Sequence, residues 1–234
     1  MKAVLSTTLG RARDLVLEDV ASPLPKKNEI LLDVQAAGVN FPDTLIIEGK
    51  YQFQPPLPFS PGGEAAGVVA AVGEKAGAFK VGDRVMALTG WGAFAEQVAV
   101  PFYNVMPIPA SMDFTTAAAF GMTYGTPMHA LRQRGQLQAG ETLLVLGASG
   151  GVGLAAVEIG KAMGARVIAA ASSAEKLAVA KAAGADELID YSQASLREEI
   201  KRLTGGQGVD VIYDPVGGEL VVQPVGGVAW NGRL

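Results

Sequence analysis

The feature that most constrains this fold is a run of glycines placed between two apolar segments. Residues 143–146 form an apolar run of strand length, and residues 154–159 show the apolar pattern of a helix. A second apolar run follows at residues 165–170. The turn between the first strand and the helix contains Gly147, Gly150, Gly151 and Gly153. The chain therefore predicts a strand, a glycine turn and a helix start in direct succession.

A glycine turn at a helix start suits a bound phosphate. The free N–H groups and the positive end of the helix dipole face such an anion, and glycines let its oxygens approach the backbone closely. The alternative is that the glycines only make a tight turn. Because a strand precedes the turn and a second βα pattern follows it, we interpret residues 143–158 as a dinucleotide site.

Composition limits the kind of protein this is. The 234 residues are 49% hydrophobic and 18% charged, which is the balance of a globular chain long enough for one or two domains. No apolar run approaches the ~20 residues of a membrane span. Residues 1–14 lack the apolar centre of a signal peptide, so we expect a cytoplasmic protein.

The titratable residues narrow the chemistry. The chain has no cysteine and one histidine, so we expect no disulfide and no zinc or other metal site. Its net charge of −4 argues against a nucleic-acid partner, and we expect a small-molecule partner instead.

The element pattern changes along the chain and predicts two domains, residues 1–118 and 119–234. The first part has strand-like runs at 29–34, 66–72, 84–88 and 94–100, separated by Pro and Gly turns. Next come a helix at 115–120 and a second one starting at Thr126, which would be its N-cap. After them, strands at 142–146, 166–170, 187–189 and 209–213 alternate with helices at 151–163, 174–183 and 195–203, ending at Gly164, Gly184 and Gly205. This alternation predicts a doubly wound parallel sheet.

The residues after the second parallel strand bear on the choice of cofactor. A domain that prefers NAD carries an acidic side chain there, about 20 residues beyond the glycines, to bind the adenosine ribose. Here Ala171 is followed by Ser172 and Ser173, with Lys176 one turn into the next helix. Hydroxyls and an ammonium would attract a 2′-phosphate, so we predict NADPH. The alternative is that a serine caps the helix and Lys176 is a solvated charge.

Several motifs together resemble the zinc-free quinone oxidoreductase (zeta-crystallin-like) branch of the medium-chain dehydrogenase/reductase superfamily. They are G-V-N-F-P-D at 38–43 with G-K-Y at 49–51, P-L-P-F-S-P-G-G-E at 56–64 with A-G-V-V at 66–69, V-G-D-R-V at 81–85, A-S-G-G-V-G at 148–153, and A-G-A-D at 183–186 with I-D-Y at 189–191. The resemblance implies an α/β protein with an N-terminal GroES-like irregular β-barrel domain and a Rossmann domain. Relatives are longer, so it also implies a chain truncated at its C-terminus, with the Rossmann domain incomplete there.

The resemblance also implies the site residues. Asn40 and Tyr51 would donate hydrogen bonds to a substrate carbonyl, and Thr126 would contact the nicotinamide. The cofactor would be bound by Asn40, Asp43, Thr126, His129, Ser149, Gly150, Gly151, Val152, Ser172, Ser173, Lys176, Tyr191 and Val216.

Each of these assignments has a structural alternative. Asn40 could support a turn, Asp43 could cap a helix, and Tyr51 could be a half-buried aromatic side chain. Thr126 could only cap its helix, and His129 could be a surface side chain. We read Glu64, which lies within the second motif, as structural.

The expected activity is NADPH-dependent hydride transfer to quinones or other conjugated carbonyls, without zinc. Such a reaction needs orientation, an apolar slot and a hydrogen-bond donor near the oxygen that gains charge. One alternative is an enoyl-thioester (acryloyl-CoA type) reductase, and another is a non-catalytic protein that binds NADPH or RNA. The resemblance implies a homodimer for the full-length protein. Pro224, Gly226 and Gly227 oppose the helix that relatives have at residues 221–227.

Overall fold

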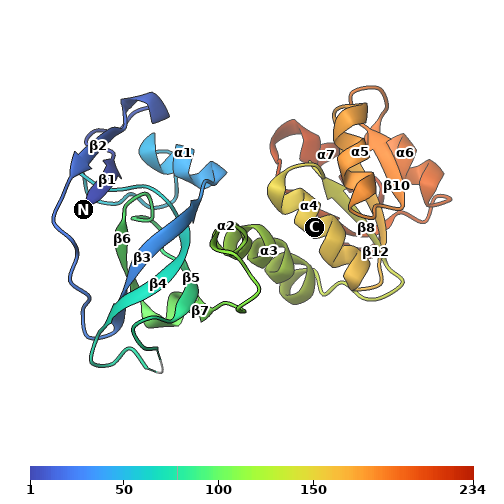
Figure 1. Cartoon of the computed structure of the whole chain (residues 1–234). Coiled ribbons are helices and arrows are strands. Elements are labelled where there is room, and N and C mark those ends of the chain that lie inside the picture. Colours follow the sequence, from blue (N-terminus) through green and yellow to red (C-terminus); the bar gives the residue numbers. More distant parts are fainter. Residues whose placement is uncertain (78) are drawn as a thin grey trace. The chain divides into compact units, whose positions relative to one another are not determined.

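The computed structural model describes residues 1–77 and 79–234, which form two compact units (Figure 1). The first unit comprises Met1–Met122 and the second Thr123–Leu234. We describe each unit by itself.

The first unit is built on a five-stranded antiparallel sheet in the order β6-β3-β4-β5-β7 (Figure 1). Its strands are β3 (Glu29–Gly38), β4 (Glu64–Val72), β5 (Arg84–Leu88), β6 (Gln97–Pro101) and β7 (Val105–Pro107). A separate antiparallel pair joins β1 (Lys2–Leu5) to β2 (Val16–Asp19). The strand expected at 84–88 is confirmed, whereas the one expected at 94–100 begins only at Gln97.

The register between β3 and β4 depends on one glycine. A Cβ on Gly67 would lie 2.0 Å from the carbonyl oxygen of Asp33, so only glycine fits there. The register shifts between Val34 and Ala36, in the same stretch of the pair. This irregularity bends the sheet over an apolar core that includes Ile30, Leu32, Val69 and Val85.

The helices before the unit boundary differ from the sequence prediction. The helix expected at 115–120 is α2 (Phe114–Ala118), and the next helix is α3 (Phe120–Met128). The prediction that a helix starts at Thr126 is therefore wrong, because Thr126 and Pro127 lie inside α3. The physical reason is that the first turn of α3 is capped from far along the chain, since the N–H of Met122 donates to Glu64 Oε2 at 2.8 Å.

The second unit contains the predicted doubly wound domain. Its parallel sheet has the order β10-β9-β8-β11-β12. The strands are β8 (Thr142–Leu146), β9 (Arg166–Ala171), β10 (Glu187–Asp190), β11 (Val209–Tyr213) and β12 (Val228–Arg233). The helices are α4 (Gly151–Ala162), α5 (Ala174–Ala182) and α6 (Leu196–Leu203).

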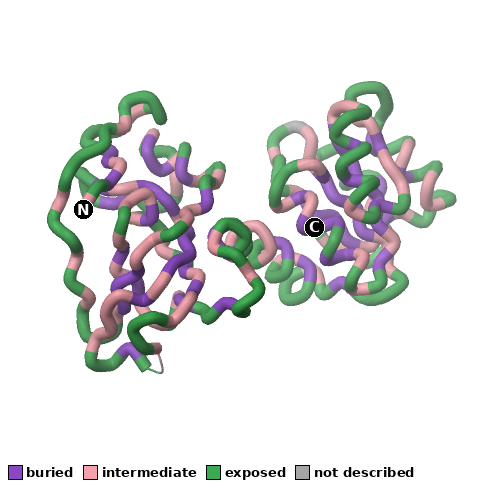
Figure 2. The backbone as a smooth tube through the Cα atoms, in the orientation of Figure 1, coloured by how far each residue is buried: buried purple, intermediate pink, exposed green. Residues whose placement is uncertain are grey.

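Alternate residues of each strand face opposite sides of this sheet. Leu143 and Val145 belong to one core cluster, together with residues of α4 and α5, and Leu144 belongs to another, together with Leu196 and Ile200 of α6. The buried segments of the second unit accordingly follow its strands in Figure 2. Helices thus cover both faces, as expected for the doubly wound sheet that the strand and helix alternation predicts.

Left-handed glycines follow three helices of this unit. Gly164, Gly184 and Gly205 have φ angles of +83°, +107° and +60°. Because this conformation strains other L-residues, these positions confirm the predicted helix ends.

The chain between β11 and β12 is more helical than predicted. A 3₁₀ turn at Gly218–Val221 runs into the short helix α7 (Val222–Val225). Pro224 is compatible with α7 because it lies in the first turn, where its missing N–H needs no partner within the helix. The expectation that Pro224 and the following glycines prevent a helix is therefore wrong for these four residues.

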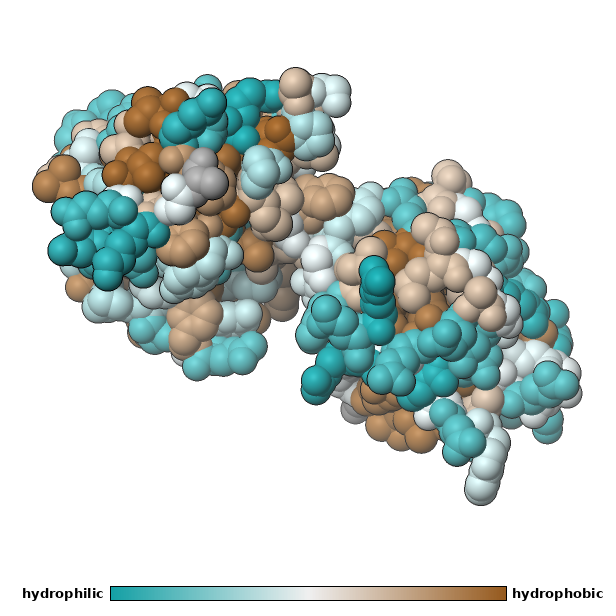
Figure 3. Space-filling view, turned by 90° about the horizontal axis from the view of Figure 1, so that it is seen from below, coloured by the Kyte–Doolittle hydropathy of each residue, from teal (hydrophilic) through white to brown (hydrophobic). Residues whose placement is uncertain are grey.

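The surface mixes polar and apolar side chains. On the face shown in Figure 3, hydrophobic side chains form small patches among hydrophilic ones. Among the described residues, no helix has the length and the apolar character needed to cross a membrane.

Candidate functional site

The glycine turn of the second unit has a backbone that excludes other residues. Gly147 has a φ of +58°, and Gly150 is the N-cap residue of α4. A Cβ on Gly153 would lie 2.3 Å from the carbonyl oxygen of Gly147 and 3.0 Å from the Cα of Ala148. Glycine at 153 thus lets α4 approach the end of β8 closely.

The N-terminus of α4 is open to a ligand. Gly150 and Gly151 are exposed, while Ser149 and Val152 are partly exposed. No side chain of the described residues caps this helix. Its first N–H groups therefore remain available to an anion.

Val216, predicted for cofactor binding, lies beside the same turn. A Cβ built on Gly147 would be 2.7 Å from its Cγ2. The loop that carries Val216 is held by Asp214, whose Oδ1 accepts hydrogen bonds from the N–H groups of Val216 and Gly217 at 2.8 and 2.9 Å. The structure therefore brings Val216 to the glycine turn.

Ser172, Ser173 and Lys176 are close together after β9. Lys176 Nζ donates to Ser172 Oγ at 2.9 Å. Ser173 is the N-cap of α5, and its Oγ accepts the N–H of Lys176 at 3.4 Å. The capping role considered for a serine is therefore real for Ser173, while Ser172 and Lys176 form a hydroxyl and ammonium pair.

Tyr191 follows the neighbouring strand at the same end of the sheet. Its N–H donates to the carbonyl oxygen of Ala171 at 3.1 Å, directly before Ser172. Glu175, the acid nearest to this pair, is bonded to Ser173, which lowers the pKa of its carboxyl group. β9 itself ends at Ala171, which carries no carboxylate, and Lys176 follows within the first turn of α5.

Thr126 and His129 lie on one helical segment. Thr126 is exposed on α3, and His129 begins a π-helical turn at His129–Arg134. His129 Nδ1 lies 2.6 Å from Gln133 Oε1, so the exposed imidazole has a local partner. On the same helix, the hydroxyl of Tyr124 donates to the Glu158 carboxylate of α4, a contact that the sequence analysis did not single out.

Asn40 and Asp43 lie at the start of α1 (Phe41–Ile47) in the first unit. Asn40 is the N-cap residue, and its N–H donates to Asp43 Oδ2 at 2.7 Å. Asp43 is buried and also accepts the Gly62 N–H at 3.2 Å. Burial raises the pKa of Asp43, although hydrogen bonds from the backbone of Asn40, Gly62 and Gly63 oppose this shift. The capping role of Asp43 is therefore observed.

Glu64, which the sequence analysis reads as structural, is buried at the start of β4. It is 2% exposed, and its Oε1 accepts the Asn40 side-chain amide at 2.9 Å. Its position in the P-G-G-E motif was the available signal. The contact itself joins residues 24 positions apart, which no local pattern reveals.

Tyr51 packs against the apolar cluster of Ile46, Ile47 and Phe59. Its ring meets Phe53 edge-on at a centroid distance of 5.2 Å, and Phe53 lies 5.8 Å from Trp91. Tyr51 is thus half-buried, as the structural alternative expects, and the neighbouring Phe53 ring is exposed.

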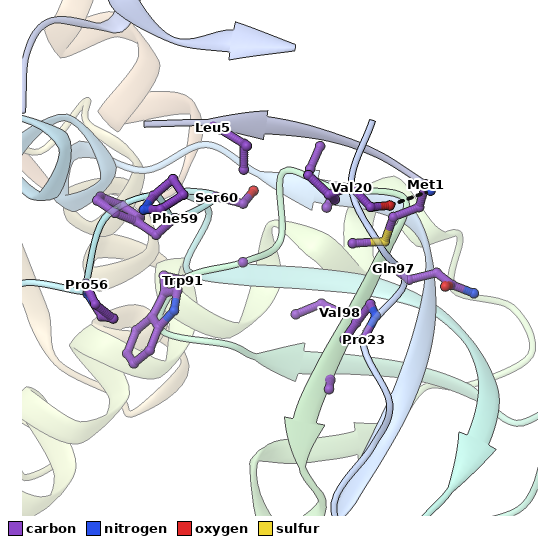
Figure 4. A pocket seen from close by; sticks show the side chains of 15 residues that line it. Met1, Leu5, Val20, Pro23, Pro56, Phe59, Ser60, Trp91, Gln97 and Val98 are labelled. Carbon is purple, nitrogen blue, oxygen red and sulfur yellow. Dashed lines mark hydrogen bonds between the residues drawn. The ribbon is translucent and has the colours of Figure 1, made fainter. Parts of the chain in front are cut away.

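An open, largely apolar pocket of about 330 Å³ lies on the first unit (Figure 4). Leu5 of β1, Val98 of β6, Phe59 and Trp91 contribute to its wall. None of the residues predicted to bind substrate or cofactor lines it. It adjoins the surroundings of Tyr51, because Tyr51 packs against Phe59 and Trp91 contacts Phe53.

The two units match two known families. Residues 26–110 match the family described as "Alcohol dehydrogenase GroES-like domain", and residues 151–234 match "Zinc-binding dehydrogenase". A probable oxidoreductase from Mycobacterium abscessus is 43% identical with a TM-score of 0.92, and the match covers 100% of this chain and 74% of that one. Escherichia coli quinone oxidoreductase, solved with NADPH, is 33% identical with a TM-score of 0.93, covering 99% and 71%.

This chain belongs to the quinone oxidoreductase branch of the medium-chain dehydrogenase/reductase superfamily. Human quinone oxidoreductase is 39% identical over 216 residues, which are 92% of this chain and 66% of that protein. The chain spans 63% to 66% of the length of four curated quinone oxidoreductase-like relatives that it matches. Its first unit is the GroES-like domain of this branch, and its second is the Rossmann domain.

The zinc-binding name of the second family does not fit the donor set of this chain. Zinc sites in proteins use Cys, His and carboxylate ligands, and this branch member has no cysteine and one histidine. Within residues 1–77 and 79–234, no group of three or more His, Asp or Glu side chains could hold a metal ion.

The residues of the second unit do suit a nicotinamide dinucleotide. The glycine turn and the open α4 N-terminus offer N–H donors, and Gly150 and Gly151 are exposed there. The Ser172 and Lys176 pair adds a hydroxyl and an ammonium at the end of β9.

Proposed function

We propose that this protein is an NADPH-dependent reductase that transfers hydride to quinones or related conjugated carbonyls. The observation that carries the proposal is the pairing of Lys176 Nζ with Ser172 Oγ directly after β9. An ammonium and a hydroxyl suit a 2′-phosphate, whereas the NAD ribose is best met by a carboxylate. The NADPH in the solved Escherichia coli quinone oxidoreductase supports this choice of cofactor.

The residues of the chain would bind and orient the reactants. The α4 N-terminus would hold the pyrophosphate through its free N–H groups, with Ser149, Gly150, Gly151 and Val152 lining the turn. Val216 and Tyr191 would contact the rest of the dinucleotide. NADPH supplies the hydride when it is bound.

On the substrate side, hydrogen-bond donors would stabilise the oxygen that gains negative charge. The Asn40 amide nitrogen has two hydrogens, of which one is used by Glu64, so the other remains for a carbonyl oxygen. The Tyr51 phenol would be a second donor. We assign Thr126 and His129 to contacts with the nicotinamide. The Asp43 carboxylate supports Asn40 by accepting a hydrogen bond from the Asn40 backbone N–H.

The test is a pair of fluorescence titrations with NADPH and NADH, followed by NADPH oxidation with 1,4-benzoquinone or acryloyl-CoA. We expect tighter binding of NADPH and turnover with the quinone. Preference for NADH would contradict the cofactor assignment. Turnover with acryloyl-CoA alone would favour the enoyl-thioester reductase, and binding without turnover would favour a non-catalytic NADPH-binding protein.

Two further predictions concern partners. We expect a homodimer for the full-length protein, which sedimentation equilibrium would test. We expect no RNA binding because the chain is acidic, and retention on an RNA column at low salt would contradict this.

A further inference from the structure

The side chain of Glu64 is a buried carboxylate with two different partners. It is 2% exposed at the start of β4. Oε1 accepts Asn40 Nδ2 at 2.9 Å, and Oε2 accepts the N–H of Met122 in the first turn of α3 at 2.8 Å. Burial of a carboxylate is costly unless both oxygens accept hydrogen bonds. The two contacts together therefore offset the cost of burying Glu64.

The carboxylate is enclosed by two glycines. A Cβ on Gly38 would lie 2.5 Å from Oε1, and one on Gly121 would lie 3.2 Å from Oε2. The carbonyl oxygen of Ala118 would be 2.6 Å from the same Gly38 Cβ. The backbone therefore leaves space for the Glu64 carboxylate and for little else, which fixes its two oxygens.

Asn40 is consequently held at both ends. Its backbone N–H is bonded to Asp43 Oδ2, and its side-chain amide is bonded to Glu64 Oε1. Reversal of the amide would set Asn40 Oδ1 against a carboxylate oxygen, two acceptors that repel each other. The carboxylate thus selects one orientation of the carboxamide, with one amide hydrogen committed and the other left for a ligand.

We propose that Glu64 is a positioning residue, which orients the Asn40 carboxamide toward the substrate carbonyl through the Oε1 contact. The same carboxylate fixes the first turn of α3, the helix on which Thr126 lies. The expected effect on catalysis rests on the proposed reductase function. The orientation of the Asn40 carboxamide by Glu64 does not depend on that function.

The test is a double-mutant cycle with E64Q and N40A. A Gln side chain places an NH2 group against one of the two donors, so at least one hydrogen bond is lost. We expect E64Q to lower kcat with benzoquinone about tenfold, as for a lost bond to a charged group, while the Kd for NADPH is unchanged. In the N40A background E64Q should change kcat less than about twofold, since its effect acts through Asn40.

A purely structural role would give a different pattern. In that case E64Q would lower kcat equally with and without Asn40, which would overturn the proposal. The control is E74Q, because Glu74 is an exposed carboxylate whose partner, Lys27, is also exposed. E74Q should leave kcat, NADPH affinity and the melting temperature unchanged.

A second measurement needs no turnover. In ¹⁵N-labelled protein, the side-chain amide signals of Asn40 are identified by their loss in N40A. We expect them to shift in E64Q and to stay in place in E74Q. Unshifted signals in E64Q would overturn the proposal even if the enzyme is active. If the wild-type protein reduces no quinone, the reductase function fails, and these signals still decide whether Glu64 orients Asn40.

Discussion

Lys176 Nζ and Ser172 Oγ lie 2.9 Å apart, immediately beyond the carboxyl end of β9. Ser173 holds this arrangement in place, because its Oγ caps α5 by accepting the N–H of Lys176. A positive charge and a hydroxyl are therefore fixed at the point where a Rossmann domain distinguishes its two dinucleotides.

The first prediction concerns Lys176. K176A should weaken NADPH binding about tenfold and change NADH binding little, because only NADPH carries the 2′-phosphate that the ammonium would meet. S172A should act in the same direction with a smaller effect. Fluorescence titration of both dinucleotides measures the ratio.

The control for Lys176 is K201A, which removes an exposed charge from the last turn of α6. It should leave both affinities unchanged. A similar loss of NADPH and NADH affinity in K176A would contradict the phosphate assignment and leave Lys176 as a solvated charge.

A second prediction concerns Gly153. G153A would bring a methyl group to 2.3 Å from the Gly147 carbonyl oxygen, so α4 must move away from β8. We expect a loss of stability of about 1 to 3 kcal/mol, as for other overpacked sites, together with weaker binding of both dinucleotides. Thermal unfolding and titration test the two effects.

The matched control for Gly153 is Gly125, another helical glycine. A Cβ on Gly125 meets no atom within 4 Å, so G125A should keep or raise the melting temperature. If G153A melts like the wild type, the close approach of α4 to β8 is not required.

The strands and the glycine turn could be predicted because their signals are local. The boundaries of β5, β8 and β11 follow apolar runs, and left-handed glycines end helices such as α4. The pair Ser172 and Lys176 is likewise local, since the two residues lie one helical turn apart. Most strands and helices of the second unit could therefore be predicted from local sequence patterns.

The start of α3 and the orientation of Asn40 could not be predicted in this way. Both depend on Glu64, which reaches Met122 over 58 positions and Asn40 over 24. The Thr126 and Pro127 pair looked like a local helix start, but the distant carboxylate had already capped the helix upstream. Long-range hydrogen bonds to buried carboxylates leave no periodicity in a sequence.

A third prediction concerns metals. Because the chain offers no cysteine and one histidine, prolonged treatment with EDTA should leave NADPH oxidation by quinone unchanged. Elemental analysis before and after treatment should find less than one zinc ion per chain. Loss of activity that added zinc restores would contradict the zinc-free expectation.

The last prediction links an ion pair of the second unit to pH. Arg233 of β12 bonds the carboxylate of Glu141, which precedes β8, and this contact lowers the pKa of Glu141 below its usual 4.5. A lowered pKa means that the folded state favours the ionised form, so the stabilisation is present above pH 4.5 and is lost as the pH falls through the folded pKa.

E141Q removes this contribution, so it should be less stable than the wild type by up to about 1 kcal/mol near neutral pH. The difference should shrink toward zero as the pH falls below 4.5 and through the lowered pKa of Glu141 in the folded state. Urea unfolding of both proteins across this range measures it. E74Q, which changes an exposed carboxylate, should show no such difference at any pH. If the difference in unfolding free energy between E141Q and the wild type did not change with pH, Gln would destabilise the protein for steric reasons. The Arg233 contact would then contribute nothing to stability.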